Sequence, residues 1–173
     1  NYKKDDAFAI YLRGSIKVLE KDYDSAKNFY LKALKIQKNI PELYINLAFI
    51  YESIEENYDE AINLLRTAVK NGINEFLVHN NLAYALIENG EIKEAEKILN
   101  YYKENSSPLI LTSKGIIAFR RDEVRRGDSY FTRAISQLDG DLKILANQYW
   151  LSEKISYYIR KNKITKAKDL CSK

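Results

Sequence analysis

The sequence predicts an all-α chain built from repeated helix pairs, and three observations lead to this prediction. Short similar phrases recur at residues 22–26, 57–61, 91–95 and 163–167, and each of them ends in Ala. Those Ala residues are spaced by 35, 34 and 72 residues, and the last interval has room for two units. Large apolar residues recur at three- and four-residue spacing, as they do on one face of a helix. No hairpin dipeptide lies between alternating apolar runs, so strands are not expected.

The pattern predicts five helix pairs in chain order. Pro41 and Pro108 each begin a unit, because the missing N–H of proline costs nothing in the first turn of a helix. Asn89 and Gly90 end a helix, where the left-handed conformation is common. The expected pairs are about 7–20 with 24–38, 41–54 with 58–71, 76–89 with 92–104, 109–121 with 124–138, and 142–161 with 164–172. The joint at residues 137–147 is longer than the others, which predicts a bend in the stacking there.

Small residues recur where the two helices of a pair must approach each other closely. They are Gly14, Ala48, Ala83 and Gly115 in the first helices, and Ala26, Ala61 and Ala95 in the second helices. Gly127 stands where the fourth unit would carry the corresponding Ala. His79 occupies a large-residue position in the third unit, and Trp150 begins the fifth, so both are expected to be packing residues.

These positions make the chain resemble the tetratricopeptide repeat family. The repeat of that family is a helix–turn–helix unit with the signature W-x2-L-G-x2-Y, then A-x3-F, then P. The second unit reads Tyr44-x2-Leu47-Ala48-x2-Tyr51, then Ala61-x3-Leu65, and the third reads His79-x2-Leu82-Ala83-x2-Leu86, then Ala95-x3-Leu99. The first and fourth units depart from the signature at Arg13, Lys17, Lys114 and Gly127, and the fifth is truncated.

The resemblance implies a right-handed α-α superhelix of about four to five repeats that forms a single domain over residues 1–173. The repeats are expected at about 7–40, 41–75, 76–107 and 108–141, with a partial repeat at 148–173. Because the sequence begins without Met, we expect it to be part of a longer protein.

The resemblance also implies that the first helix of each pair lines a concave groove. The residues expected to bind a partner there are Tyr11, Asn46, Phe49, Asn80, Asn81, Tyr84, Thr112, Ile116 and Phe119. Position 12 of the first four units, which is Val18, Glu52, Ile87 and Phe119, is expected to face the groove as well. An aromatic stripe with a polar rim is typical of a protein-binding surface, and its natural ligand is an apolar peptide or an amphipathic helix. The alternative is that the fifth helix pair, or a further segment of the chain, covers the stripe.

A chaperone tail is not the expected ligand. Chaperone-binding members of the family hold a C-terminal carboxylate with a clamp of Lys, Asn and Arg. The clamp positions here carry Tyr11, Ser15, Leu77 and Asn81, and Asn46 alone remains.

The composition argues against catalysis and against metal or phosphate binding. One Cys and one His allow neither an internal disulfide nor a Cys/His zinc site. The six Gly form no phosphate-cradling loop. We therefore expect no enzyme activity, no cofactor and no metal. No apolar run approaches the roughly 18 residues that a membrane span needs, so a cytoplasmic protein is expected, with a periplasmic or membrane-tethered one as the alternative if a flanking segment exists.

Charge is distributed unevenly along the chain. Residues 1–113 have a net charge of −3 and residues 114–173 a net charge of +7. The basic patch of Arg120, Arg121, Arg125 and Arg126 suggests either an acidic partner or anionic surface, or a solvated face with local ion pairs, which is the favoured interpretation. No aromatic stacking motif accompanies the patch, so nucleic acid is not expected. The remaining alternative is a homo-oligomer that associates through the C-terminal unit.

Overall fold

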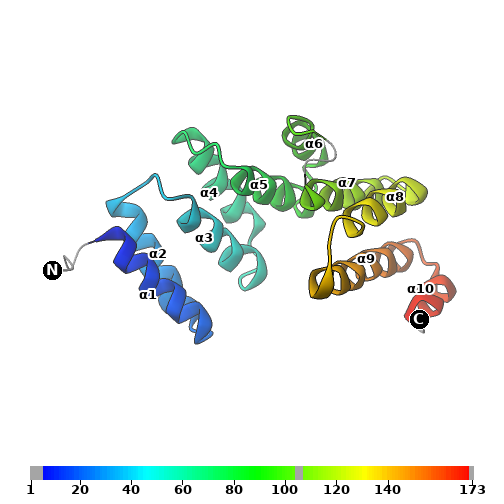
Figure 1. The fold of residues 1–173 in the computed structure, drawn as a ribbon, viewed down its shortest axis with the longest axis horizontal. Helices are drawn as coiled ribbons and strands as arrows, with labels where there is room; N and C mark the ends of the chain where they lie inside the picture. Colours follow the sequence, from blue (N-terminus) through cyan, green and yellow to red (C-terminus); the bar gives the residue numbers. More distant parts are fainter. Residues whose placement is uncertain (1–5, 104–106, 172–173) are drawn as a thin grey trace. The chain divides into compact units, whose positions relative to one another are not determined.

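A computed structural model describes residues 6–103 and 107–171 of the chain. The chain divides into two compact units, residues 1–95 and residues 96–173. Within the described ranges all regular structure is helical (Figure 1). The helices are α1 (Ala7–Leu19), α2 (Tyr23–Ile36), α3 (Pro41–Ser53), α4 (Tyr58–Lys70), α5 (Phe76–Glu88), α6 (Ile92–Asn100), α7 (Pro108–Arg120), α8 (Val124–Ile135), α9 (Gly140–Arg160) and α10 (Ile164–Cys171).

The five predicted helix pairs are all present, and most of their ends agree with the prediction within two residues. α6 is shorter than expected, because it ends at Asn100, whereas the predicted end at 104 lies outside the described residues. The long joint expected at residues 137–147 is wrong. α9 begins at Gly140, so only residues 136–139 connect it to α8.

Local sequence explains where several helices begin. The side chains of Asp6, Asp22, Asn57 and Ser107 each accept a hydrogen bond from a backbone N–H of the helix that follows. Pro41 and Pro108 are the first residues of α3 and α7, as predicted. These caps and prolines satisfy or remove the N–H groups that a helix start leaves without partners.

The turn inside each helix pair has the same backbone conformation. One residue with positive φ stands two positions before each second helix: Lys21, Glu56, Gly90, Asp122 and Asn162, with φ between 52° and 86°. In the α1–α2 and α7–α8 turns the next N–H then bonds back five residues, from Asp22 to Lys17 and from Glu123 to Ala118, both at 2.9 Å. This geometry caps the end of the first helix and reverses the chain. Of these five residues only Gly90 was predicted to be left-handed.

In unit 1 (residues 1–95), consecutive helices pack in order from α1 to α5, and α3 also contacts α5. Its core includes Ile10, Ala26, Tyr30, Ala33, Leu43, Leu47 and Ile50. The close approach predicted at Gly14 is confirmed, because a Cβ there would lie 2.5 Å from the Tyr30 ring. The small residues of the sequence therefore mark positions where a neighbouring aromatic ring fills the space.

In unit 2 (residues 96–173), α7 packs against α8 and α9, and α9 packs against α10. Gly115 and Gly127 admit the rings of Phe131 and Phe119, since a Cβ at either glycine would lie within 2.7 Å of a ring atom. The indole of Trp150 donates to Asp128 at 3.2 Å and thereby links α9 to α8. Trp150 thus has the packing role that was predicted for it.

Candidate functional site

Two of the predicted groove residues in unit 1 are held by the core beneath them. The Tyr11 ring lies 5.8 Å from the ring of Tyr30, which is 1% exposed. Asn46 donates to the Tyr30 hydroxyl at 3.4 Å, and that hydroxyl donates to Ser15 at 3.3 Å. Burial raises the pKa of Tyr30 above its usual value, so the hydroxyl stays protonated. Hydrogen bonds through the Tyr30 hydroxyl therefore connect α1, α2 and α3.

The neighbouring first helices, α3 and α5, carry the other groove residues of unit 1. Phe49 on α3 is 44% exposed, which is a large fraction for a phenylalanine. Asn81 and Tyr84 on α5 are half-buried. Asn80 is only 9% exposed, and its Oδ1 atom has no hydrogen-bond partner. An accessible aromatic ring and an unsatisfied amide oxygen thus occur on two helices that contact each other.

Glu52 belongs to the same region but is not among the predicted binding residues. It lies one turn after Phe49 on α3, and its Oε1 atom is buried without a hydrogen-bond partner. Burial, and secondarily the charge of Glu88 on α5, raise the pKa of Glu52 to about 7. The sequence did contain a signal. Glu52 is the one polar residue at position 12, where the other units carry Val18, Ile87 and Phe119.

In unit 2 the structure corrects the predicted stripe. Ile116 and Phe119 are each 1% exposed, and Thr112 is half-buried. The Phe119 ring stacks on Phe131 at 5.6 Å and on Tyr157 of α9 at 5.9 Å. Ile116 and Phe119 are therefore core residues rather than accessible groove residues. The Phe119 ring is covered by α8 and by α9, which is the first helix of the fifth pair.

The basic patch is partly neutralised within unit 2. Arg121 donates to Glu96 at 2.6 Å, and Arg126 donates to Glu123 at 2.9 Å and to the Tyr130 hydroxyl at 3.3 Å. Arg125 is exposed and Arg120 is half-buried. The guanidinium groups of Arg121 and Arg126 are therefore in local ion pairs.

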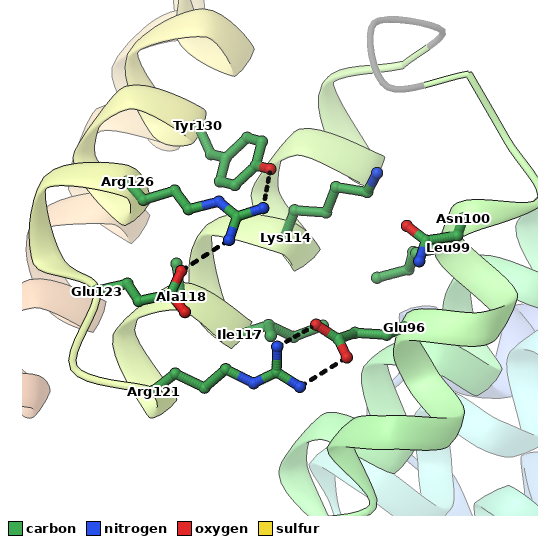
Figure 2. Close-up of a pocket in the computed structure, with 10 residues that line it drawn as sticks. All are labelled: Glu96, Leu99, Asn100, Lys114, Ile117, Ala118, Arg121, Glu123, Arg126 and Tyr130. Carbon is green, nitrogen blue, oxygen red and sulfur yellow. Dashed lines mark hydrogen bonds and ion pairs between the residues drawn. The ribbon is translucent and has the colours of Figure 1, made fainter.

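A shallow pocket of about 170 Å³ lies next to this patch, between the end of α6 and the α7–α8 pair. Figure 2 shows the side chains of Arg121 and Arg126 turned toward Glu96 and Glu123, with Lys114 on the same wall. Both carboxylates of the pocket are therefore engaged by the two arginines. Its lining is polar, so it differs in character from the aromatic surface of unit 1.

His79 is half-buried on α5, and burial lowers its pKa. The prediction of a packing role for His79 agrees with this placement. In the described parts of the chain, no three His, Cys, Asp or Glu side chains gather as they would around a metal ion. Across the same ranges, no helix combines the length and the apolar character required to cross a bilayer.

Comparison with known proteins adds to these observations. The sequence profile of the tetratricopeptide repeat matches residues 9–40 and 41–71. No curated protein matches the sequence.

Several solved structures share the fold. A chain of the APC/C hetero-tetramer Cut9-Hcn1 superposes with a TM-score of 0.73 at 19% identity, over 96% of this chain and 32% of that one. YrrB, a TPR protein with a peptide-binding site described as unusual, gives a TM-score of 0.63 at 18% identity, over 97% and 84%. PilW, a type IV pilus biogenesis factor, gives 0.68 at 14% identity, over 96% and 75%. This chain thus spans about a third of the length of the Cut9-Hcn1 chain that it matches.

The repeated turns, the small residues between paired helices, the profile matches in two consecutive units and the shared fold lead to one assignment. Residues 9–71 carry two tetratricopeptide repeats, and the chain as a whole shares the all-α superhelical fold of the solved structures that it matches.

Proposed function

We propose that the chain is a non-catalytic module that binds an apolar or amphipathic segment of a partner protein on the first-helix face of unit 1. This face consists of the groove residues that stay accessible there: Tyr11, Asn46, Phe49, Asn81 and Tyr84. A tetratricopeptide fold is a scaffold for protein–protein interaction, and the finer assignment rests on these residues.

The exposure of Phe49 is the observation that carries the proposal. A ring that is 44% exposed on a helix flanked by other helices leaves apolar area in water, and covering that area by a partner is favourable. Tyr11 and Asn46 are held in place by Tyr30, so little side-chain entropy is lost when a partner covers them. Aromatic anchors of this kind dominate binding energy in protein interfaces.

A peptide-binding measurement tests the proposal. Peptides are selected from a randomised display library on the wild-type chain, and their affinity is then measured by fluorescence anisotropy. Phe49→Ala with Tyr84→Ala is expected to weaken binding by at least about 100-fold, because two aromatic anchors are lost. Circular dichroism should show unchanged helicity.

A matched control uses Leu142→Ala on α9, which removes an apolar side chain that is 63% exposed in unit 2. This variant is expected to bind as tightly as the wild type. Equal binding by the double variant and the wild type would refute the assignment to unit 1. Failure of the library to yield any binder would count against the proposal as a whole.

The acidic-partner alternative has less support. The guanidinium groups of Arg121 and Arg126 already bind carboxylates of the same unit, which leaves Arg125 as the accessible charge without a described ion pair. An exposed side chain that has no fixed partner contributes little specificity on its own.

A further inference from the structure

Glu52 is placed where the repeat calls for an apolar residue. Position 12 is occupied by Val18, Ile87 and Phe119 in the other described units, and two of these three are 1% exposed. Glu52 takes the corresponding place on α3, with its Oε1 atom buried and without a hydrogen-bond partner. A carboxylate at such a position loses hydration and receives no protein donor in return.

A buried acceptor without a partner is a cost that folded proteins rarely retain without a use. A second carboxylate, Glu88 of α5, acts on Glu52 with the same sign of charge and increases that cost. The two acidic residues come from helices that contact each other.

Three basic residues of unit 1 are engaged by carboxylates other than Glu52. Lys17 pairs with Glu20 and Asp22, at 2.7 and 3.6 Å. Lys27 pairs with Glu55 at 2.8 Å. Arg66 pairs with Glu91 and Glu94, at 3.0 and 2.8 Å. Each of these three basic side chains therefore pairs with a described carboxylate other than that of Glu52.

Aromatic and acidic side chains are neighbours along α3 and along α5. Phe49 lies one helical turn before Glu52 on α3, and Tyr84 lies one turn before Glu88 on α5. Asn80 lies one turn before Tyr84 on α5, and its buried Oδ1 atom is another acceptor without a hydrogen-bond partner. The ligand that complements this set offers apolar area, a positive charge and N–H donors.

We propose that Glu52 and Glu88 form a recognition site for a lysine or arginine side chain of the partner segment, next to the aromatic anchors Phe49 and Tyr84. The inference rests on the proposed function, because it assigns a specificity to the same face. The basic side chain pairs with the half-buried carboxylate of Glu52 from its exposed side, its alkyl stem covers the neighbouring rings, and the apolar residues beside it contact Phe49.

The test uses the full chain and peptides selected from the randomised library. We expect the selected sequences to be enriched in one Lys or Arg within an apolar stretch. Each selected peptide is then compared with a version in which norleucine replaces the lysine, or citrulline the arginine, so that length and most of the shape are kept while the charge is lost. The wild-type chain is expected to bind the basic version at least about tenfold more tightly, as for a charge-assisted hydrogen bond.

The matching protein variant is Glu52→Gln, which keeps the size of the side chain and removes its charge. It is expected to lose the preference for the basic peptide and to bind the neutral version as the wild type does. Glu60→Gln on α4, which removes an exposed carboxylate from a second helix of unit 1, is expected to retain the full preference.

The outcomes separate the inference from the proposed function. If Phe49→Ala weakens binding and Glu52→Gln leaves the preference for the basic peptide intact, the charge-recognition site is wrong while the proposed function stands. If no basic residue is enriched, the inference is likewise overturned. If Phe49→Ala has no effect, the proposed function fails. A fall in the pKa of Glu52 on addition of the basic peptide, followed by NMR of its carboxyl carbon, would support the inference independently of affinity.

Discussion

At the scale of single residues, the smallest side chains decide where the helices of a pair meet. Gly14 and Gly115 take equivalent places in the first and fourth units, and each faces an aromatic ring across the pair. Gly127, on the second helix of the fourth unit, likewise leaves room for the ring of Phe119 on the first helix. The rings of Tyr30, Phe119 and Phe131 are each 1% exposed, so they cannot move aside to admit a methyl group.

Gly115→Ala is therefore expected to destabilise the chain, although alanine favours a helix more than glycine does. The added Cβ would lie 2.7 Å from the Phe131 ring, and such overpacking costs about 2 kcal/mol in the free energy of unfolding. Urea denaturation measures the change. Ser129→Ala, at an exposed site on α8, is the control and should leave stability within about 0.5 kcal/mol. A stable Gly115→Ala variant would contradict the packing described here.

At the same scale, Glu52 makes the free energy of unfolding depend on pH. Its pKa is raised from 4.5 to about 7 in the folded chain, first by burial and then by Glu88. Between these two values the unfolded chain releases the proton and the folded chain keeps it, so the free energy of unfolding falls as the pH rises. The stabilising contribution is complete below about pH 4.5 and lost above about pH 7.

Glu52→Gln should consequently be more stable than the wild type at pH 8, by about 2 kcal/mol, and nearly equal to it at pH 4. Thermal unfolding at the two pH values, with Glu60→Gln as the control, measures the difference. A variant that is less stable than the wild type at pH 8 would show that the carboxylate has a stabilising partner after all.

At the scale of elements, the helices were predictable and the turns were not. Apolar spacing, Pro41, Pro108 and the recurring Ala residues were enough to assign the helix pairs, because they report directly on burial and on helix starts. The left-handed turn residue was recognisable only at Gly90. In two units its place is taken by Lys21 and Glu56, whose side chains carry no sequence signal for positive φ. In the other two it is taken by Asp122 and Asn162, residue types that adopt this conformation more often but also occur widely elsewhere.

Glu56→Gly tests the turn. Glu56 has φ of 52°, a conformation that costs a residue with a side chain roughly 1 kcal/mol and costs glycine almost nothing. The substitution is expected to raise the free energy of unfolding by about 0.5–1 kcal/mol. The same change at Glu60, in the first turn of α4, should instead lower it by up to about 1 kcal/mol, because glycine weakens a helix and the carboxylate favoured by the helix dipole is lost. Destabilisation by both substitutions would argue against a left-handed residue at 56.

At the scale of the whole molecule, equivalent positions in the repeats differ in what covers them. Repeat periodicity predicts Phe49, Ile116 and Phe119 in one stripe, yet Ile116 and Phe119 are each 1% exposed while Phe49 is 44% exposed. The Phe119 ring packs on Phe131 of α8 and Tyr157 of α9. Sequence periodicity identifies the face of a helix, but only tertiary packing determines whether another helix covers it. The same limit applies to Glu52, whose burial the sequence does not predict because it depends on the packing of α3 against α5.

The central claim is that the first helices of unit 1 bind a segment of a partner protein. Hydrogen–deuterium exchange of the full chain, with and without a peptide selected from the library, tests this claim most directly. We expect slower exchange in α3 and α5, around Phe49 and Tyr84, because a bound peptide stabilises these helices. Slower exchange confined to α8, α9 and α10, with no change in α3 or α5, would contradict it.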